Sequence, residues 1–370
     1  MSVAPDFTPD RAPARSIGTP LSRRLFIVAT GALTVTFGSI AIGGIPLLAG
    51  LGVVSLLALG LLPGGSRRYL LRRAGRVAGT VFVAMAIVWL LIHNYPDAAR
   101  QDETGVVPAM VQYISWLGDV VAGEMGDTQY QETVEEGLSR TIPISMQLLV
   151  YSQIMALLIA IPGAILGAQY RGRAIDLVFR GVGILGLAVP MFVSGLLLMY
   201  LLGVGDLELF GLSWGIQLFP TGRYIPIADG VWRHIRSMVL PSFTLALTTA
   251  ATYLVLLRAE MLQQLSLDHV QLARSKGLSP GRIVRRHAFR PATPTLVAIV
   301  GAQSGMILGN MLIVERIFLL PGFSDYVLVA IGRRDVIAIA GSLFVIASIL
   351  AVINLFADAL LLAADPRLDR

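Results

Sequence analysis

The amino-acid sequence predicts an all-α integral membrane protein with about eight transmembrane helices. Hydrophobic residues make up 55% of the 370 residues and charged residues only 14%, and the mean hydropathy is +0.73. Several uncharged runs approach the ~20 residues with which a helix crosses the hydrocarbon core of a bilayer. Lysine and arginine gather in alternate connecting segments, as the positive-inside rule expects of cytoplasmic loops.

The predicted spans follow from the apolar runs and from the residues that interrupt them. Most of the 29 lysine and arginine residues fall in segments that are cytoplasmic when both termini are inside. We therefore expect a multi-pass protein of the cell (inner, cytoplasmic) membrane with both termini in the cytoplasm. The predicted spans are Leu25–Ile42, Ile45–Leu62, Val77–His93, Ile142–Ala168, Arg180–Gly203, Val239–Leu257, Thr293–Val314 and Val336–Leu362.

The N-terminal part divides into a tail and a helical hairpin. Residues 1–24 contain several prolines and show no apolar periodicity, which predicts a disordered cytoplasmic tail. Arginines on both sides of residues 25–66 favour the cytoplasm, and Gly43, Gly44 and Pro46 supply a turn between two spans. A re-entrant pair is the alternative, whereas a signal peptide fits poorly because the apolar run is too long.

Residues 67–370 form the main transmembrane domain, and its largest outer segment is 94–141. Acidic residues there clearly outnumber Arg100 and Arg140. The amphipathic stretch "VQYISWLGDVV" predicts a small helical cap over the outer mouth. A solvated connector without a partner is the alternative, because charge runs are often only solvated.

A charged loop, residues 259–292, separates two apolar segments. Ser266 can cap a short helix that runs to Lys276, and Gly277 suits the left-handed position just past its end. Ser279 and Pro280 are typical of the N-cap and first residue of a second helix. The loop is therefore predicted to consist of two short helices at an angle.

The faces of these two helices indicate a docking surface. Three apolar positions, Leu267, Val270 and Ala273, share one face of the first helix. Three arginines, Arg282, Arg286 and Arg290, recur at helical spacing on the second. A DNA-binding helix-turn-helix would look similar, but a loop tethered at both ends to membrane spans could not readily enter a major groove. Anionic lipid headgroups are another explanation of the arginine stripe.

Sequence blocks along the chain resemble a known family. These blocks include "TIPISMQL" from Thr141, "HVQLARSKGLSPGRIVRRHAFRPA" from His269, "IVERIFLLPGF" from Ile313 and "INLFADALLLAADPR" from Ile353. Over residues 67–370 the chain resembles the inner-membrane permease subunits of ABC importers of the dipeptide, oligopeptide and nickel type. Two features depart from that family: the N-terminal hairpin is extra, and the segment between Pro96 and Gln112 is shorter than usual.

The resemblance implies a six-helix permease core, with the hairpin added, and a two-helix cytoplasmic coupling loop that docks in a separate ATPase. The implied partners are two ATP-binding subunits, a paralogous permease subunit, an extracytoplasmic solute-binding protein and membrane lipid, with no nucleic acid. Gln271 stands where the broader superfamily has glutamate. The residues assigned to coupling are Asp268, Val270, Gln271, Ala273, Lys276, Gly277, Ser279, Arg282, Arg286, His287 and Arg290.

The residues themselves favour a transport subunit without an ATPase site of its own. A P-loop needs Lys followed by Ser or Thr, but Lys276, the single lysine, is followed by glycine. The chain has no cysteine, and its four histidines show no metal-ligand spacing. We therefore expect no cofactor or metal on this chain, with ATP bound by partner subunits.

Two further groups of residues are candidates for helix packing, for the pathway or for gating. Gly301, Gly305 and Gly309 repeat every four residues and allow close helix approach, within this subunit or against a second permease. Pro190 should kink its span, as should Pro162 and Pro241. Gln147 and Asn310 are polar groups at membrane depth that could line a pathway. Glu315, Pro321 and Gly322 begin an outer loop, for which the resemblance implies a gate facing the binding protein.

The sequence therefore favours the translocation subunit of an ATP-driven importer, for peptides or a similar small solute. An autonomous secondary transporter or channel is the alternative, but intramembrane acid-base pairs and internal repeats are not evident. A membrane-embedded hydrolase is weaker still, because the sequence offers no Ser-His-Asp or paired-carboxylate constellation on a common span.

Overall fold

The computed structural model describes residues 64–93, 106–122, 124–128, 132–204, 207–209, 212–214 and 218–364. The predicted tail 1–24 and nearly all of the predicted hairpin 25–66 lie outside the described residues. Within the described part, four helices are long and apolar enough to cross a membrane, or up to five if one bent pair counts as a single span. The structure is therefore that of a helical, multi-span membrane protein, and the predicted number of eight stays a prediction.

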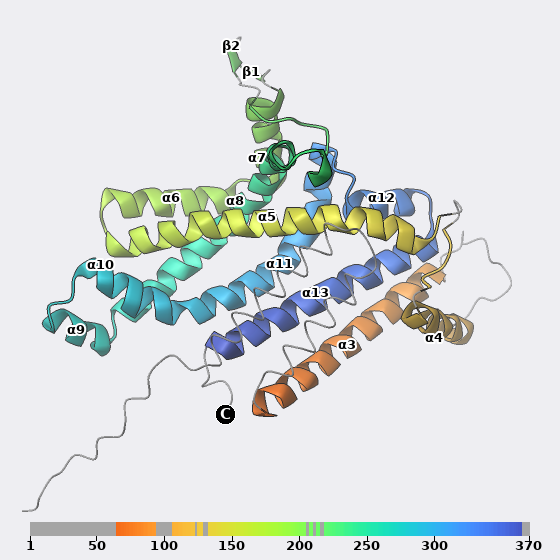
Figure 1. Ribbon diagram of the computed structural model, residues 1–370, viewed down its shortest axis with the longest axis horizontal. Coiled ribbons are helices and arrows are strands. Elements are labelled where there is room, and N and C mark those ends of the chain that lie inside the picture. Colours follow the sequence, from red (N-terminus) through yellow and green to blue (C-terminus); the bar gives the residue numbers. More distant parts are fainter. Residues whose placement is uncertain are drawn as a thin grey trace, which may run out of the picture.

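The four long spans form the centre of the molecule. They are α5 (Val134–Gln169), α8 (Val231–Leu265), the continuous run Pro280–Phe318 that ends in α11 (Arg290–Phe318), and the part of α13 (Val336–Ala364) up to Asp358. Helix α5 packs on α8, α8 also packs on α11, and α11 packs on α13. Figure 1 shows these helices side by side along the long axis of the molecule.

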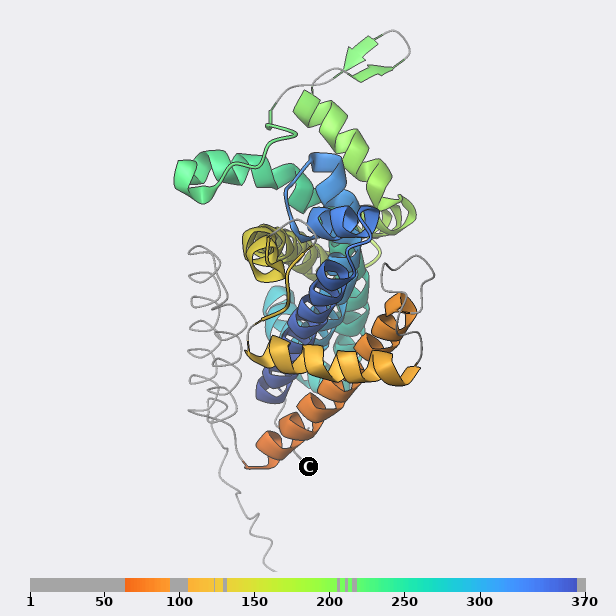
Figure 2. The ribbon, with the colours of Figure 1, turned by 90° about the vertical axis from the view of Figure 1, so that its right-hand side faces the viewer.

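The predicted span Val77–His93 belongs to α3 (Gly64–His93), which packs on α13. Its apolar stretch, Ala74–Leu90, is shorter than those of the four long spans. The helix α4 (Val106–Ala122) packs on α3 and lies across one end of the bundle (Figure 2). The aromatic rings of Trp89, Tyr113 and Trp116 join the two helices, with centroids 5.2 to 6.3 Å apart. The amphipathic helix predicted for the outer segment is thus present.

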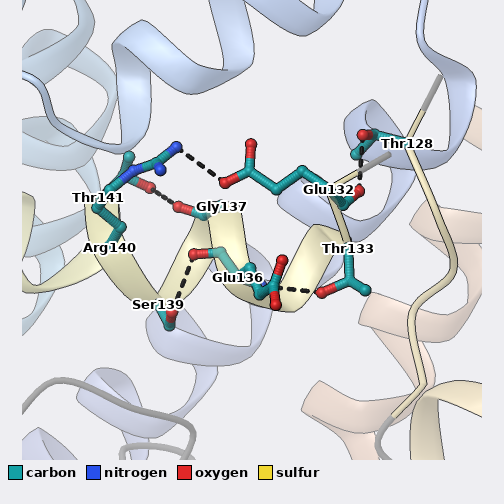
Figure 3. A network of polar contacts seen from close by, with 8 residues as sticks. All are labelled: Thr128, Glu132, Thr133, Glu136, Gly137, Ser139, Arg140 and Thr141. Atoms are coloured by element: carbon teal, nitrogen blue, oxygen red, sulfur yellow. Dashed lines mark hydrogen bonds and ion pairs between the residues drawn. The ribbon is translucent and has the colours of Figure 1, made fainter. Parts of the chain in front are cut away.

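The helix that follows the outer segment begins earlier than the predicted span. The prediction assigned residues 94–141 to the cap, whereas α5 begins at Val134. Thr133 is the reason, because its hydroxyl oxygen accepts a hydrogen bond from the amide of Glu136 at 3.2 Å and so caps the helix. Figure 3 shows this first turn, where Arg140 also reaches back to Glu132 at 3.0 Å.

The span predicted at Arg180–Gly203 is not one straight helix. The chain forms α6 (Ala174–Ala188), α7 (Met191–Leu198) and the π-helical η1 (Met199–Val204), with a bend of 103° at the break. Pro190 has no amide hydrogen to donate and its ring collides with a preceding turn, and Val189 before it is extended, with φ −79° and ψ 122°. The expected kink is therefore a complete break, whereas α5 and α8 continue through Pro162 and Pro241.

A small β-hairpin accompanies the helices in the described part of the chain, whose fold is all-α in class. Strands β1 (Leu207–Leu209) and β2 (Leu212–Trp214) pair antiparallel, with Leu207 opposite Trp214. Only two residues separate the strands, so pairing closes a very short loop at little entropic cost. Helical periodicity does not detect elements this short. In Figure 1 the hairpin and α7 project to one side of the long helices.

The glycine repeat of α11 serves packing inside this subunit at two of its three positions. A Cβ atom on Gly301 would lie 2.6 Å from the Cβ of Ala357 on α13, and one on Gly305 would lie 3.6 Å from Leu350. A Cβ on Gly309 would meet no described atom within 4 Å. Close helix approach therefore explains Gly301 and Gly305.

We predict that Gly301→Ala destabilises the protein, because the added methyl group overlaps Ala357. Overpacking typically costs about 1 to 3 kcal/mol, against which alanine in a helix recovers about 0.5 to 1 kcal/mol. Gly309→Ala is the matched control and should be neutral or slightly stabilising, since its methyl group meets open space. Titration with SDS in mixed micelles measures the free energy of unfolding. Equal stability of the two variants would contradict the close approach of α11 and α13.

Candidate functional site

The charged loop forms an elbow of two short helices beyond the ends of the long spans. These are α9 (Asp268–Ser275) and α10 (Pro280–Ile283), and α10 continues through the π-helical η3 (Val284–Phe289) into α11. Figure 1 shows α9 and α10 together at the end of the bundle opposite to α4 and α12 (Phe323–Gly332). We call residues 266–290 the elbow.

The turn of the elbow depends on Gly277. Its φ of +74° is in the left-handed region that favours glycine. The amide of Gly277 donates to the carbonyl of Arg274 at 2.9 Å, and the amide of Leu278 donates to that of Ala273 at 3.3 Å. This pair of bonds is a Schellman motif, which satisfies the last carbonyls of α9 and reverses the chain. The prediction for Gly277 is confirmed.

One of the two predicted helix caps differs from the structure, and the other agrees with it. Ser266 was predicted to cap the first short helix, but it ends α8 and its hydroxyl donates to the carbonyl of Gln263 at 2.7 Å. Leu267 takes the N-cap position of α9 instead. Ser279 and Pro280 occupy the N-cap and the first turn of α10, as predicted.

A small apolar core holds the two short helices at their angle. Val270, Ala273 and Ile283 are buried together, with Leu265 and Leu278 packed against them. Leu267 was predicted to share this face but is exposed, because it precedes α9 in an extended conformation and is out of helical register. Val270 and Ala273 therefore shape the elbow from inside.

The remaining assigned residues lie on the outside of the elbow. His287 is half-buried, and its ring lies 6.4 Å from the ring of His269, measured between centroids. Leu272, which was not among the predicted site residues, is an exposed apolar residue on the same elbow. The exposed assigned residues are Asp268, Gln271, Lys276, Gly277, Ser279, Arg282, Arg286 and Arg290.

The elbow is firmly attached to two long spans. Val284, Ala288 and Ala292 are buried in one apolar cluster with Leu257 and Met261 of α8. Alanines of α5 belong to the same cluster, and such small side chains allow the helices to approach closely. The elbow is therefore packed directly on α8 and continuous with α11.

At the opposite end, the predicted gate residue Glu315 is buried and acts as a helix cap. Its side chain is only 1% exposed. The Ser145 hydroxyl donates to Oε1 at 2.5 Å, and the amide of Ser324 donates to Oε2 at 2.9 Å. The amide of Phe323 donates to the Ser145 hydroxyl oxygen at 2.8 Å. A carboxylate at the N-terminus of α12 interacts favourably with the helix dipole, so this arrangement joins α5, α11 and α12.

The other predicted gate residues lie beside this cap. Gly322 is buried against the Glu315 carboxyl group, so closely that a Cβ atom at this position would overlap it. Pro321 is exposed. Ser145 was not among the predicted site residues, although it lies within the block "TIPISMQL". Further along α12, burial raises the pKa of Tyr326 to about 12, so this phenol stays neutral.

The candidate pathway residues are not gathered at one place. Gln147 is buried, and its Oε1 accepts a hydrogen bond from Tyr224 at 3.2 Å. Asn310 is half-buried, and Pro190 and Gly309 are exposed. A polar junction that the site prediction did not include joins three spans: Tyr253 donates to Gln153 Oε1 at 2.6 Å, and Gln153 Nε2 donates to Ser304 at 2.9 Å.

Long apolar spans, an exposed elbow anchored to two of them and a buried cap at the opposite end define a membrane transport subunit of the permease class. Comparison with known proteins identifies its family. The profile of the binding-protein-dependent transport system inner membrane components matches residues 140–370. The chain belongs to this family, the permease subunits of ABC importers.

Curated relatives agree with this membership. The chain is 31% identical to the oligopeptide transport system permease protein AppB of Bacillus subtilis, over 71% of this chain and 81% of the relative. It is 25% identical to the dipeptide transport system permease protein DppB of Bacillus subtilis, over 81% of this chain and 97% of the relative. It is 26% identical to DppB of Alkalihalophilus pseudofirmus, over 88% and 96%.

We predict that Gly322→Ala disrupts the buried cap. The new methyl group would displace the Glu315 carboxylate from the N-terminus of α12, at a cost on the order of 2 kcal/mol in the free energy of unfolding. Gly332→Ala, at the other end of α12, is the matched control, since a Cβ there meets no described atom within 4 Å. Thermal unfolding in detergent compares the two variants. A Gly322→Ala protein as stable as the control would refute the role of the cap.

Proposed function

We propose that this chain is the translocation-pathway subunit of an ATP-driven importer of peptides or a similar small solute, coupled to separate ATPase subunits through the elbow. The observation that carries the proposal is the elbow itself, which presents charged residues outward and is packed internally against α8 and α11. An amphipathic helical element of this kind is suited to lie in a groove of a partner. The names of the relatives support peptides as the solute.

The proposed assembly contains two ATP-binding subunits, a solute-binding protein outside and a second, paralogous permease subunit. With the elbow in the cytoplasm, both termini are cytoplasmic and the α4 and α12 end faces outward. Exposed apolar residues such as Leu177, Ile184 and Leu185 on α6 would then contact lipid or the second permease.

Coupling follows from the geometry of the elbow. An ATPase that changes shape moves α9 and α10 as one body, because Val270, Ala273 and Ile283 form a common core. Because the η3 segment is packed on α8 and continues into α11, both helices move with it. These two helices are rigid and cross the membrane, so the movement reaches its other side. Such sliding and hinging of packed helices is an ordinary route between two transporter conformations.

The proposal is tested by reconstitution in liposomes. The chain alone should take up no peptide, whereas the complex with its ATPases and binding protein should take up peptide only with ATP. Solute-driven uptake by the purified single chain would overturn the proposed function in favour of a secondary transporter or channel.

We predict that Gly277→Val uncouples the complex. A β-branched residue in the left-handed conformation costs about 1 to 2 kcal/mol, so the turn would relax and change the angle between α9 and α10. Peptide uptake should fall on the order of tenfold, while the variant still inserts and ATP hydrolysis continues.

Gly281→Ala is the matched control within the elbow. Gly281 lies in α10, and a Cβ there would lie 3.9 Å from the side chain of Gln169, an ordinary contact distance. Uptake by this variant should equal that of the wild type. Wild-type uptake and ATPase stimulation with Gly277→Val would count against coupling through the elbow.

A further inference from the structure

A buried ion pair that was not evident from the sequence joins α6 to α8 near the elbow. Arg258 of α8 binds Asp176 of α6 in a bidentate manner: Nε donates to Oδ1 at 2.8 Å and Nη2 donates to Oδ2 at 2.9 Å. The side chain of Asp176 is 2% exposed and that of Arg258 is 14% exposed. The amide of Gly172 also donates to Asp176 Oδ2, at 2.9 Å. The carboxylate thus joins the α5–α6 turn and the first turn of α6 to α8.

The helix α6 packs against α5 and α8 with few buried residues of its own. Along α6, which is described throughout, only Asp176 and Gly183 are buried. Beyond the ion pair it approaches α8 through two glycines: a Cβ on Gly183 would lie 3.0 Å from Val255 Cγ2, and one on Gly186 would lie 2.8 Å from the Cβ of Ala251. The ion pair is therefore the polar anchor of a helix that lies on the surface of the subunit, and this helix begins the broken span.

Arg258 lies in the part of α8 that packs against the η3 segment of the elbow. Its neighbour Leu257 and the residue one turn further on, Met261, are buried against the η3 segment. α8 continues from Arg258 to Leu265, where it meets the elbow. A movement of the elbow therefore reaches Arg258 within two turns of one helix.

Stability alone does not account for such a pair. Removing two charges from water is costly, and well-packed apolar residues often stabilise a fold as well or better. What a bidentate arginine–carboxylate pair adds is a fixed geometry, because two parallel hydrogen bonds resist rotation and sliding. The pair is thus suited to keep α6 in register with α8.

We propose that Asp176 and Arg258 are positioning residues, which make α6 and the broken span that it begins move together with α8 when the elbow moves. The inference rests on the proposed function, since it presupposes that the elbow receives movement from an ATPase. In the complete importer, ATP hydrolysis would then displace the α6–α7 break through this pair.

The test uses the full importer in liposomes, with its binding protein and a peptide, and measures ATP-driven uptake and ATP hydrolysis separately. Asp176→Asn removes the charge while keeping the size of the side chain, and it should lower uptake on the order of tenfold while hydrolysis continues. Glu132→Gln is the matched control, because Glu132 is only half-buried and its partner Arg140 is exposed, at the far end of α5. The control should transport as the wild type does.

A disulfide gives a second test that is independent of the charge. The chain contains no cysteine, so Gly183→Cys with Val255→Cys introduces the only two thiols. A sulfur in the place of Val255 Cγ2 would lie 3.0 Å from the new Cβ at position 183, which is compatible with an S–S bond of about 2.0 Å. Because α6 and α8 should move as one body, oxidation with copper–phenanthroline should leave uptake unchanged. When the two cysteines are combined with Asp176→Asn, oxidation should restore uptake, because the disulfide replaces the ion pair as the link between α6 and α8.

The outcomes separate this inference from the proposed function. If Gly277→Val uncouples the importer but Asp176→Asn transports normally, or if the disulfide in the otherwise wild-type chain blocks uptake, the ion pair does not act as we infer. If Gly277→Val behaves as the wild type, coupling through the elbow is refuted instead. Should Asp176→Asn fail to accumulate in the membrane, the disulfide in the otherwise wild-type chain decides the inference alone.

Discussion

Hydrocarbon offers no hydrogen-bond partners, so every polar group within the spans must find one inside the protein. Three side-chain groupings satisfy this constraint, and each joins helices that are distant in sequence. Glu315 caps α12 and binds α5, Gln153 joins α8 to α11, and Asp176 binds α8. The same bonds that avoid the cost of unpaired polar groups therefore also determine which helices stay together, and the relative placement of the spans depends on them.

Small side chains allow these bonds to form at close range. The halves of α5 and α8 nearer to the elbow meet through alanines, and α11 meets α13 at Gly301. Where the backbones lie so close, an added methyl group has no space, and rotation about the contact is restricted. Packing between spans and polar pairing thus support the same arrangement, in which α5, α8 and α11 form the common framework.

The two ends of that framework have different characters. One end carries an exposed, charged elbow with its own small core, and the opposite end carries a buried carboxylate that accepts hydrogen bonds from the Ser324 amide and the Ser145 hydroxyl. The first arrangement leaves a surface available for a partner, and the second holds α12 against α5 and α11. Helix α11 connects the two ends without interruption. It begins at the elbow with Arg290 and ends at Phe318, with Glu315 in its last turn. A permease needs such a connection, because ATP is used on one side and the solute arrives on the other.

Hydropathy and local signals in the sequence determined the class of the fold, the positions of the long spans and the turn at Gly277, because each depends on neighbouring residues along the chain. Pro190 was expected to kink its span, but local signals did not predict a break of 103° or that α7 packs on α8 and α11. The partners of Glu315 and Asp176 could not be predicted, because Ser145 lies 170 residues from Glu315 and Arg258 lies 82 residues from Asp176. Single-sequence periodicity reports which face of a helix is apolar but not which helix covers it. Only the tertiary structure decided those pairings, since they arise from the way in which distant polar groups are brought together away from water.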